Sequence, residues 1–188
     1  MKKKGFTLIE LLAVIVILSL TVMIVIVKVD KNIKDANKFG NERTTEMLEN
    51  AATLYVENYR SELSNINSKG VDVITIDKLI NKGLIESKDV NDPVTNVIVV
   101  AVINDVIRAK YTKTSMNVIF LKGSSEISIY KGNNYVELGA YVAIPGSGLV
   151  ELTNSNISST VNKNTIGKYK VTYTYSGASS VERIVNVI

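Results

Sequence analysis

The stretch Met1-Lys-Lys-Lys-Gly-Phe-Thr-Leu-Ile-Glu10 places one carboxylate inside an otherwise uncharged apolar run. Apart from Glu10, no charged residue occurs from Phe6 to Val27. As a helix this segment would be ~33 Å long, enough to span the ~30 Å hydrocarbon layer of a bilayer. A carboxylate there costs about 2.5–3.5 kcal/mol on insertion scales, so Glu10 is a candidate functional residue. The run itself offers no partner, so we expect one from another molecule.

The same stretch resembles the class III signal of type IV pilins and pseudopilins. In that family a short basic leader ends in Gly, and the residue after it, usually Phe, becomes the new N-terminus. The resemblance implies a leader at residues 1–5, cleavage between Gly5 and Phe6, and N-methylation of Phe6, by a prepilin peptidase/N-methyltransferase. Glu10 falls where the family carries its acid. The basic residues of the leader are Lys2, Lys3 and Lys4.

Processing at this point would create the cation that Glu10 needs. Gly5 has no side chain, so an extended backbone can lie deep in a peptidase groove. Cleavage exposes a charged amine on Phe6, which could pair with Glu10 of a neighbouring subunit during assembly. Two buried charges are costly singly and tolerable as a pair, so the pair would set axial register more than add stability. The resemblance also implies other pilin subunits and an inner-membrane assembly platform as partners.

Two other interpretations of the apolar run are open. A secretory signal peptide has an apolar core of about 7–15 residues and a small-residue cleavage site, whereas this core is longer and no A-x-A site follows it. A simple signal anchor would span the membrane without needing Glu10. Lysines lie on both sides of the run, so the positive-inside rule is ambiguous. The pilin resemblance implies a cytoplasmic N-terminus, extracellular C-terminal domains and a final place in a cell-surface filament.

The composition excludes several kinds of site. The 188 residues contain no Cys, His or Trp, which removes disulfides, thiolate chemistry, and the commonest general base and metal ligand. We therefore expect no enzymatic activity and no cofactor. The formal net charge of +4 falls to about +1 without the leader lysines, so it gives little support for nucleic acid as a partner.

A pilin-like head is expected at residues 40–122, after a transmembrane or filament helix at 6–39. From Glu42 to about Asn65, apolar residues recur every three or four positions, which predicts a helix with one buried face. These residues are Leu48, Ala51, Ala52, Tyr55, Tyr59 and Leu63. Such a face needs a covering layer, so we expect the helix to pack on a sheet and its tyrosines to serve in packing.

Three β-rich runs are expected to form that sheet. They are Val97–Asn104, Val106–Thr112 and Met116–Leu121. Asn104-Asp105 suits a tight turn between the first two runs. The prediction is a three-stranded antiparallel meander, in which Ile98, Val100 and Val102 share one face.

The segment between the helix and the sheet predicts a short capped helix and then a loop. The short helix should end at Gly83, with Asp77 as its N-cap. In the loop, Asp89, Asn91 and Asp92 could offer oxygen ligands to calcium, but the full EF-hand spacing is missing and Asp before Pro is common in turns. We expect a turn there, with calcium binding as the lesser alternative.

Residues 123–188 change in composition and show no helical period. They are rich in Ser, Asn, Gly, Val, Tyr and Thr, and short β-rich runs alternate with turn signals, which is typical of a β-sandwich. The predicted strands are Glu126–Tyr130, Tyr135–Leu138, Tyr141–Ile144, Val150–Thr153, Asn156–Val161, Lys168–Tyr175 and Val181–Ile188. Strict alternation places Tyr169, Val171, Tyr173 and Tyr175 on one face.

This region resembles a bacterial Ig-like domain of the kind repeated in surface proteins, which implies a fold rather than an activity. The matching phrases are Tyr135-Val-Glu-Leu-Gly-Ala140, Ile166-Gly-Lys-Tyr-Lys-Val-Thr-Tyr173 and Arg183-Ile-Val-Asn-Val187. The expected fold class is therefore α+β. It combines a long N-terminal helix, a helix packed on a small antiparallel sheet, and a C-terminal Ig-like β-sandwich.

Two functional hypotheses follow from these features. The first is a structural subunit of a type IV pilus or pseudopilus. The second is a minor or tip subunit whose Ig-like domain binds a glycan, cell wall, a host surface or incoming DNA. Lys163, Lys168 and Lys170 lie near Tyr169 in the sequence, but three lysines are few for a nucleic-acid surface. We expect them to serve solubility.

Overall fold

The computed structural model describes residues 8, 11, 12, 14, 15, 41–90, 96–112, 114 and 116–188. The chain divides into two compact units, Met1–Thr44 and Thr45–Ile188. No helix within the described ranges is both long and apolar enough to span a membrane. The predicted membrane run, residues 6–27, falls almost wholly outside those ranges.

A helix runs through residues 41–59 and continues into the 3₁₀ turn η1 (Arg60–Glu62). Its predicted apolar face is confirmed, since Leu48 and Tyr55 are buried, whereas Leu54 on the other side is 46% exposed. The helix shares one apolar cluster with the strand residues Ile74, Ile98 and Val100. Packing of this stripe, rather than helix propensity alone, stabilises the helix.

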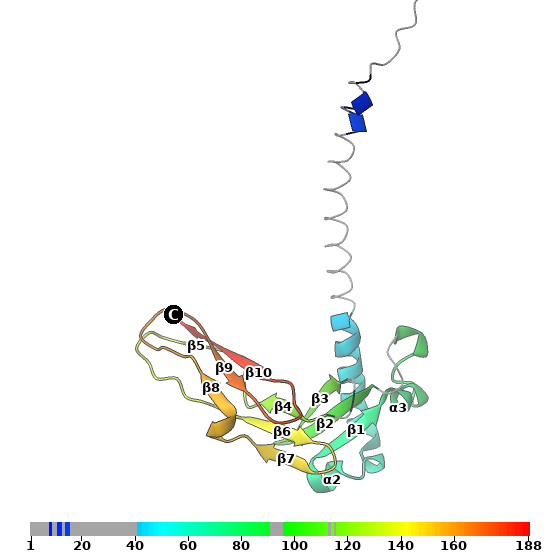
Figure 1. The fold of residues 1–188 in the computed structure, drawn as a ribbon. Helices are drawn as coiled ribbons and strands as arrows, with labels where there is room; N and C mark the ends of the chain where they lie inside the picture. Colours follow the sequence, from blue (N-terminus) through cyan, green and yellow to red (C-terminus); the bar gives the residue numbers. More distant parts are fainter. Residues whose placement is uncertain are drawn as a thin grey trace, which may run out of the picture. The chain divides into compact units, whose positions relative to one another are not determined.

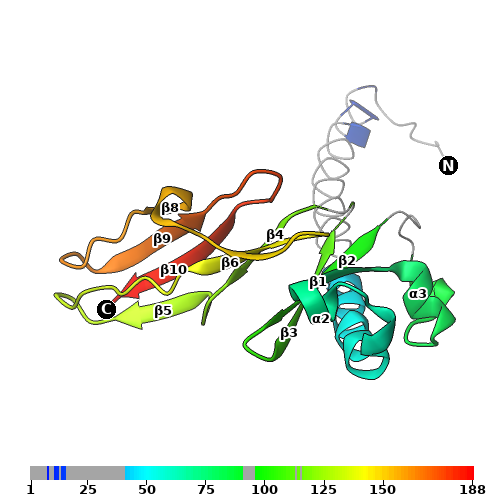
Figure 2. The ribbon, with the colours of Figure 1, turned by 90° about the horizontal axis from the view of Figure 1, so that it is seen from below.

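The sheet against this helix has three antiparallel strands in the order β1-β2-β3 (Figures 1 and 2). They are β1 (Val71–Thr75), β2 (Val97–Ile103) and β3 (Val106–Thr112). The predicted hairpin between β2 and β3 is confirmed. Asn104 and Asp105 both have positive φ, 50° and 62°, as a type I′ turn requires.

The third strand of this sheet is not the one that the sequence predicts. Met116–Leu121 does not extend the meander, because β4 (Val118–Leu121) pairs with a strand of another sheet, while β1 pairs with β2. The physical reason lies in β2, whose apolar residues are buried on both faces. Ile98 and Val100 pack toward the helix, and Val99 and Ala101 belong to a different cluster. Such a strand needs a neighbour on each edge as well as a cover on each face.

Two short helices flank β1 in the sequence, α2 (Ile66–Lys69) before it and α3 (Ile76–Asn81) after it. The 3₁₀ turn η2 (Ser87–Asp89) follows further along the chain. The predicted N-cap is wrong: the Thr75 hydroxyl, not Asp77, accepts the capping hydrogen bond, from the Lys78 amide at 3.4 Å. Asp77 lies in the first turn, where a carboxylate suits the helix dipole. Gly83, with φ of 68°, follows the helix end as predicted.

Two further sheets form a β-sandwich, in the orders β5-β10-β9-β8 and β4-β6-β7. β5 and β10 pair in parallel, and the other neighbouring strands are antiparallel. Their bounds are β5 (Glu126–Ile129), β6 (Ala140–Ile144), β7 (Gly148–Glu151), β8 (Ile157–Ser159), β9 (Gly167–Tyr173) and β10 (Val181–Val187), with η3 at Asn154–Asn156. The structure is therefore α+β, as the sequence predicts.

One predicted strand of the sandwich is absent, and one predicted face is confirmed. Tyr135–Leu138 forms no strand, because its side chains hold a loop in place through hydrogen bonds to the core. In β9, Val171 and Tyr173 are buried in the sandwich core, and Tyr169 packs against them. The period-two pattern thus placed this strand correctly.

The face of the first sheet that is turned away from the helix packs on the β4-β6-β7 sheet. A shared apolar cluster joins Val71, Val99 and Ala101 of the first sheet to Val118 and Ala143 of the second. The backbones of β7 and α2 approach closely at Gly148 (φ 119°), where a Cβ would lie 2.9 Å from the carbonyl O of Lys69. Residues Thr45–Ile188 accordingly form one compact unit rather than two independent domains.

Candidate functional site

The residues predicted for processing and assembly lie outside the described ranges. They are Lys2, Lys3, Lys4, Gly5, Phe6 and Glu10. The described residues of the same run are helical and 47–84% exposed: Leu8, Leu11, Leu12, Val14 and Ile15. Their spacing places Leu8, Leu11, Leu12 and Ile15 on one side of the helix. An exposed apolar side of this kind suits lipid or the helices of neighbouring subunits.

The most distinctive polar site of the described part lies inside the β-sandwich. Arg183, on β10, is fully buried, which an arginine tolerates only when it is paired. Its Nη1 donates to Glu137 Oε1 at 2.8 Å and to the Tyr173 hydroxyl at 2.5 Å. Its Nε donates to the carbonyl O of Ser124 at 2.9 Å, and its Nη2 donates to that of Lys122. One guanidinium therefore joins two strands and two loops.

Glu137 receives a second set of hydrogen bonds. Its Oε1 accepts from the Tyr173 hydroxyl at 2.5 Å and from the Gly139 amide at 2.7 Å, and its Oε2 accepts from the Tyr135 hydroxyl at 2.8 Å. Burial alone would raise the pKa of Glu137, but the hydrogen bonds and Arg183 outweigh it, so this pKa lies below the ordinary value. Burial, and then the bond to Glu137, raise the pKa of Tyr173. At neutral pH the carboxylate is charged and the phenol is protonated.

This cluster is built for structure rather than for chemistry. Every buried side-chain nitrogen or oxygen of the described residues has a hydrogen-bond partner, so the cluster offers no free group to a substrate. A buried ion pair adds little net stability over apolar packing, but it fixes one geometry. Here it fixes the loop before β6 against the core.

Sequence reasoning missed this cluster although it named the residues. The three Ig-like phrases each contribute to it: the first supplies Tyr135, Glu137 and Gly139, the second Tyr173, and the third Arg183. The available signal was the alternation of β10. Positions 183, 185 and 187 face the core, so an arginine at the first of them must find a buried partner.

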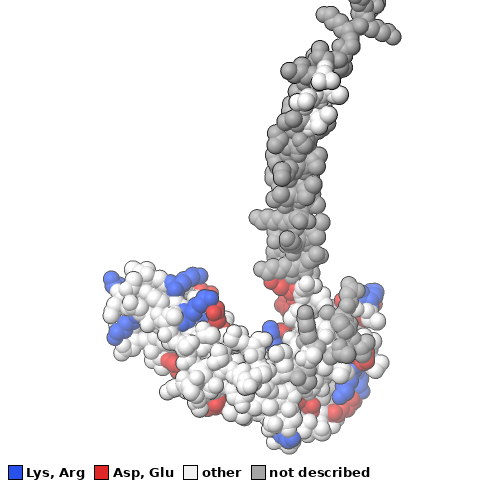
Figure 3. Space-filling view, in the orientation of Figure 1, with Lys and Arg blue, Asp and Glu red and all other residues white. Residues whose placement is uncertain are grey.

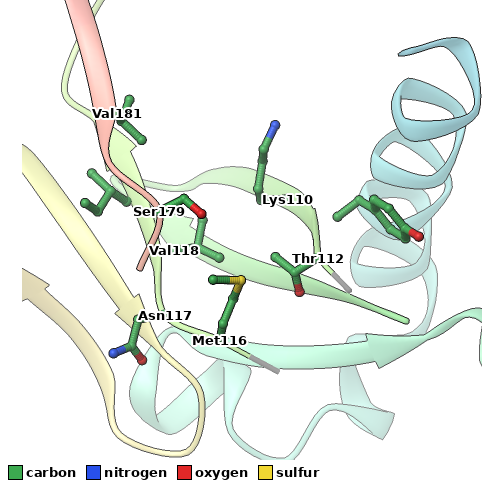
Figure 4. A pocket seen from close by; sticks show the side chains of 9 residues that line it. Lys110, Thr112, Met116, Asn117, Val118, Ser179 and Val181 are labelled. Atoms are coloured by element: carbon green, nitrogen blue, oxygen red, sulfur yellow. The ribbon is translucent and has the colours of Figure 1, made fainter. Parts of the chain in front are cut away.

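A cavity of about 350 Å³ lies where the ends of β3 and β4 approach the segment before β10 (Figure 4). Its lining is largely apolar and includes Met116, Val118, Ile119 and Val181. Two polar groups at its wall already have partners. The Thr112 hydroxyl donates to the carbonyl O of Thr114 at 2.7 Å, and Lys110 pairs with Glu49 at 3.3 Å. The cavity thus has apolar volume but lacks the convergent polar groups that define a specific ligand site.

The lysines considered for nucleic-acid binding each have a nearby partner. The pairs are Lys170 with Glu182 at 2.7 Å, Lys168 with Glu126 at 3.8 Å, and Lys163 with the side-chain oxygen Oδ1 of Asn134 at 2.6 Å. A single-strand binder needs a basic groove with stacked aromatic faces. Tyr169 and Tyr173 instead pack in the core, so these residues give no support for a nucleic-acid partner.

The residues of the calcium prediction lie partly outside the described ranges. Asp89 ends η2, whereas Asn91 and Asp92 lie outside the described ranges. Within those ranges no group of three or more His, Cys, Asp or Glu residues is placed to hold a metal ion.

Comparisons with known proteins identify both ends of the chain. Residues 1–26 match the model of the prokaryotic N-terminal methylation motif, and residues 119–187 match that of the bacterial surface protein Ig-like domain. A similar solved structure is that of the lipoprotein BT2262 from Bacteroides thetaiotaomicron, with 29% identity and a TM-score of 0.31. The similarity covers 38% of this chain and 37% of that one. No curated protein matches the chain.

The chain therefore carries a type IV pilin signal at its N-terminus and a bacterial surface Ig-like domain at its C-terminus. Both features are typical of proteins of the bacterial cell surface.

Proposed function

We propose that the chain is a structural subunit of a type IV pilus or pseudopilus that assembles through its N-terminal helix. The match of residues 1–26 to the methylation motif carries this proposal. In this organisation residues 1–5 are the leader, 6–39 the transmembrane and assembly helix, 40–122 the pilin-like head and 123–188 the Ig-like domain. The sequence suggests the last boundary after residue 122; we propose that it lies before Val118 instead, because β4 pairs within the sandwich.

Processing removes the leader between Gly5 and Phe6. A prepilin peptidase cleaves after Gly5, and its methyltransferase activity methylates the new amine on Phe6. In line with the pilin signal, the N-terminus lies on the cytoplasmic side, and the head and Ig-like domain lie outside. The subunit is then a single-pass membrane protein until an assembly platform moves it into a surface filament.

Assembly pairs the Phe6 amine of one subunit with Glu10 of the next. The exposed apolar side formed by Leu8, Leu11, Leu12 and Ile15 supports this step, because such a side can exchange lipid for neighbouring helices. In that apolar setting an unpaired carboxylate is costly. The pair therefore selects one axial register among several that apolar packing alone would allow.

The decisive variant is Glu10→Gln, produced in cells that assemble the filament. We expect the variant to reach the membrane and lose its leader, but to be depleted from the sheared filament fraction. Glu57→Gln is the matched control, because Glu57 is an exposed acid on the helix 41–59. Normal incorporation of Glu10→Gln into the filament would contradict the pairing of Phe6 with Glu10. For the chain without substitutions, a measured mass that still includes residues 1–5 would contradict the processing step.

A minor or tip subunit is the second candidate function. It shares the N-terminal steps and differs in using the Ig-like domain to bind a surface. The observation that favours it is a set of exposed apolar residues at the free end of the sandwich, among them Tyr130 (71% exposed) and Ile166 (66%). Relative abundance in the purified filament separates the two candidates, since a main subunit is plentiful and a tip subunit is scarce.

A further inference from the structure

Three large apolar side chains form a row at the end of the β5-β10-β9 sheet. Val187 of β10 pairs with Ile129 of β5 and with Gly167 of β9. One rung further, the same register aligns Tyr130, Ile188 and Ile166. Since side chains alternate across a sheet and the Ile129–Val187 rung faces the core, the next rung faces outward. We call Tyr130, Ile166 and Ile188 the end row.

The end row is exposed, whereas most of the other outward positions of this face are polar. Tyr130 is 71% exposed, Ile166 66% and Ile188 55%. The neighbouring outward positions carry ion pairs and hydrogen bonds, such as Lys170 with Glu182 and Asn186 with Glu126. Scattered apolar residues are common on surfaces, but three in one row at the tip of a domain form a patch that marks a binding surface.

Two lysines beside the end row lack an acidic partner. Lys131 follows Tyr130 directly, and Lys163 lies close to it because the Gly132 amide donates to the carbonyl O of Lys163 at 2.8 Å. The Lys163 ammonium contacts only the neutral Asn134 side chain, and neither lysine forms an ion pair within the described residues. Figure 3 shows basic side chains gathered at this end of the sandwich. The end row is therefore apolar and is flanked by two lysines without an ion pair.

We propose that this end of the Ig-like domain docks onto an anionic lipid bilayer. Charge complementarity selects a negative partner, and the end row selects one that accepts aliphatic side chains. Tyrosine prefers the membrane interface, isoleucine enters the acyl region, and lysine binds anionic headgroups.

Other partners fit less well. A stable protein interface needs about 800 Å² from each partner, more than a row of three side chains at a convex tip provides. An acidic polysaccharide would use the lysines but leave the isoleucines in water. The inference rests on the proposed function in one respect: a filament repeats the weak contact many times, and avidity then makes it useful.

The test uses the absence of tryptophan from the chain. Tyr130→Trp introduces a single indole at the end row and keeps an interfacial aromatic there. The full chain is reconstituted into phosphatidylcholine vesicles, with or without phosphatidylglycerol, and flotation confirms anchoring. Brominated lipid is then placed either in those vesicles or in a second population, where it quenches an indole that enters the bilayer.

When the vesicles contain phosphatidylglycerol, we expect brominated lipid to quench the indole from the reconstituted vesicles, from the second population, or from both. The indole emission should also shift to the blue. The double variant Lys131→Gln/Lys163→Gln removes both charges. It should bind phosphatidylglycerol vesicles about thirty-fold more weakly, because each lysine contributes ~1 kcal/mol. Ile166→Ser should also reduce the quenching. The matched control is Val150→Trp on β7, a position 45% exposed on the other sheet, which should remain unquenched.

The outcomes separate this inference from the proposed function. Flotation without quenching in any arrangement overturns lipid docking while leaving anchoring intact. Failure to float contradicts anchoring, and quenching by the added brominated vesicles would still support docking. An indole that shifts to the blue with polyglutamate, but is not quenched by vesicles, overturns lipid docking in favour of an acidic protein partner.

Discussion

The two cores of the second unit solve the burial of a large tyrosine differently. In the head, Tyr55 packs among aliphatic residues and its hydroxyl reaches out to Glu62 Oε2 at 2.8 Å. In the sandwich, Tyr173 is equally buried, but its hydroxyl lies between Glu137 and the fully buried Arg183. Burial is the main cause that raises the pKa of Tyr55 to about 12, and it is also the main cause that raises the pKa of Tyr173. The head core thus keeps its charges at the rim, whereas the sandwich core encloses one.

This difference separates stability from specificity. An apolar core gains free energy from area and accepts many packings of similar volume. A buried guanidinium gains little net free energy, but it is satisfied only when every partner is in place. We therefore expect the head core to respond to changes in volume and the sandwich core to respond to the loss of a single hydrogen-bonding group.

The largest effect should come from Glu137→Gln. This change leaves the Arg183 charge buried without its counter-ion, and removing one member of a buried pair costs about 3–5 kcal/mol. The measurement is urea unfolding of the full chain in mild detergent, followed by far-UV circular dichroism. Glu151→Gln is the control, because its pair with Lys122 is exposed and should contribute less than about 1 kcal/mol.

A double variant sharpens the same point. Adding Arg183→Met to Glu137→Gln removes the unpaired charge and should recover part of the lost free energy of unfolding. If the double variant were less stable than the sum of both single changes, the unpaired charge would not be the cause.

The next effect, about 3 kcal/mol within a range of 2–5, is expected for Leu48→Ala in the head core. Leu48 is fully buried on the helix, so truncation removes apolar contacts and leaves a cavity. Leu54→Ala makes the same chemical change on the same helix at a position 46% exposed and should alter the unfolding midpoint little. Equal losses in the two variants would contradict the assignment of the buried face.

A smaller effect should appear where the two cores meet. Gly148→Ala forces a Cβ to 2.9 Å from the carbonyl O of Lys69, in addition to the strain of φ 119°. Gly146→Ala has positive φ too (79°), but nothing lies within 4 Å of its Cβ, so it measures strain alone, about 1–2 kcal/mol. We expect Gly148→Ala to lose at least ~1 kcal/mol more, as judged by thermal unfolding. Similar losses would show that the junction yields without cost.

The apolar layers could be predicted from the sequence because they follow simple periods. The three- and four-residue spacing around Leu48 and Tyr55 predicts the helix, and two adjacent residues, Asn104 and Asp105, predict the hairpin. These signals are local. Each depends on residues within one turn or one strand pair.

The strand partners and the buried cluster depend on contacts between distant residues. Nothing near Val71–Thr75 marks it as the neighbour of β2, since its length and its Asp72 suit a loop equally well. Glu137 and Arg183 are 46 residues apart, and each alone is typical of a solvated strand. The available sequence signal was the alternation in β10, where Arg183 shares one face with Val185 and Val187, which are buried. Register between distant strands is a tertiary property that no local pattern supplies.

The smallest effect that still separates the two cores is their response to acid. The folded-state pKa of Glu137 lies below the ordinary value of 4.5, because hydrogen bonds and Arg183 outweigh burial. Its contribution to stability is therefore complete above pH 4.5 and is lost as the pH falls through the folded-state pKa. Glu62 of the head also has a lowered pKa, through its hydrogen bond from Lys82.

Salt distinguishes these two carboxylates. The Glu62–Lys82 pair is exposed, with 44% and 32% of its side chains accessible, so added salt should screen its part of the acid response. Glu137 pairs with a guanidinium that solvent does not reach, and its part should persist in high salt. The urea midpoint, measured from neutral pH to below 4.5 at low and high salt, tests both. Glu137→Gln should abolish the salt-resistant part, and Glu62→Gln only the salt-sensitive part; the reverse assignment would refute the enclosed charge in the sandwich core.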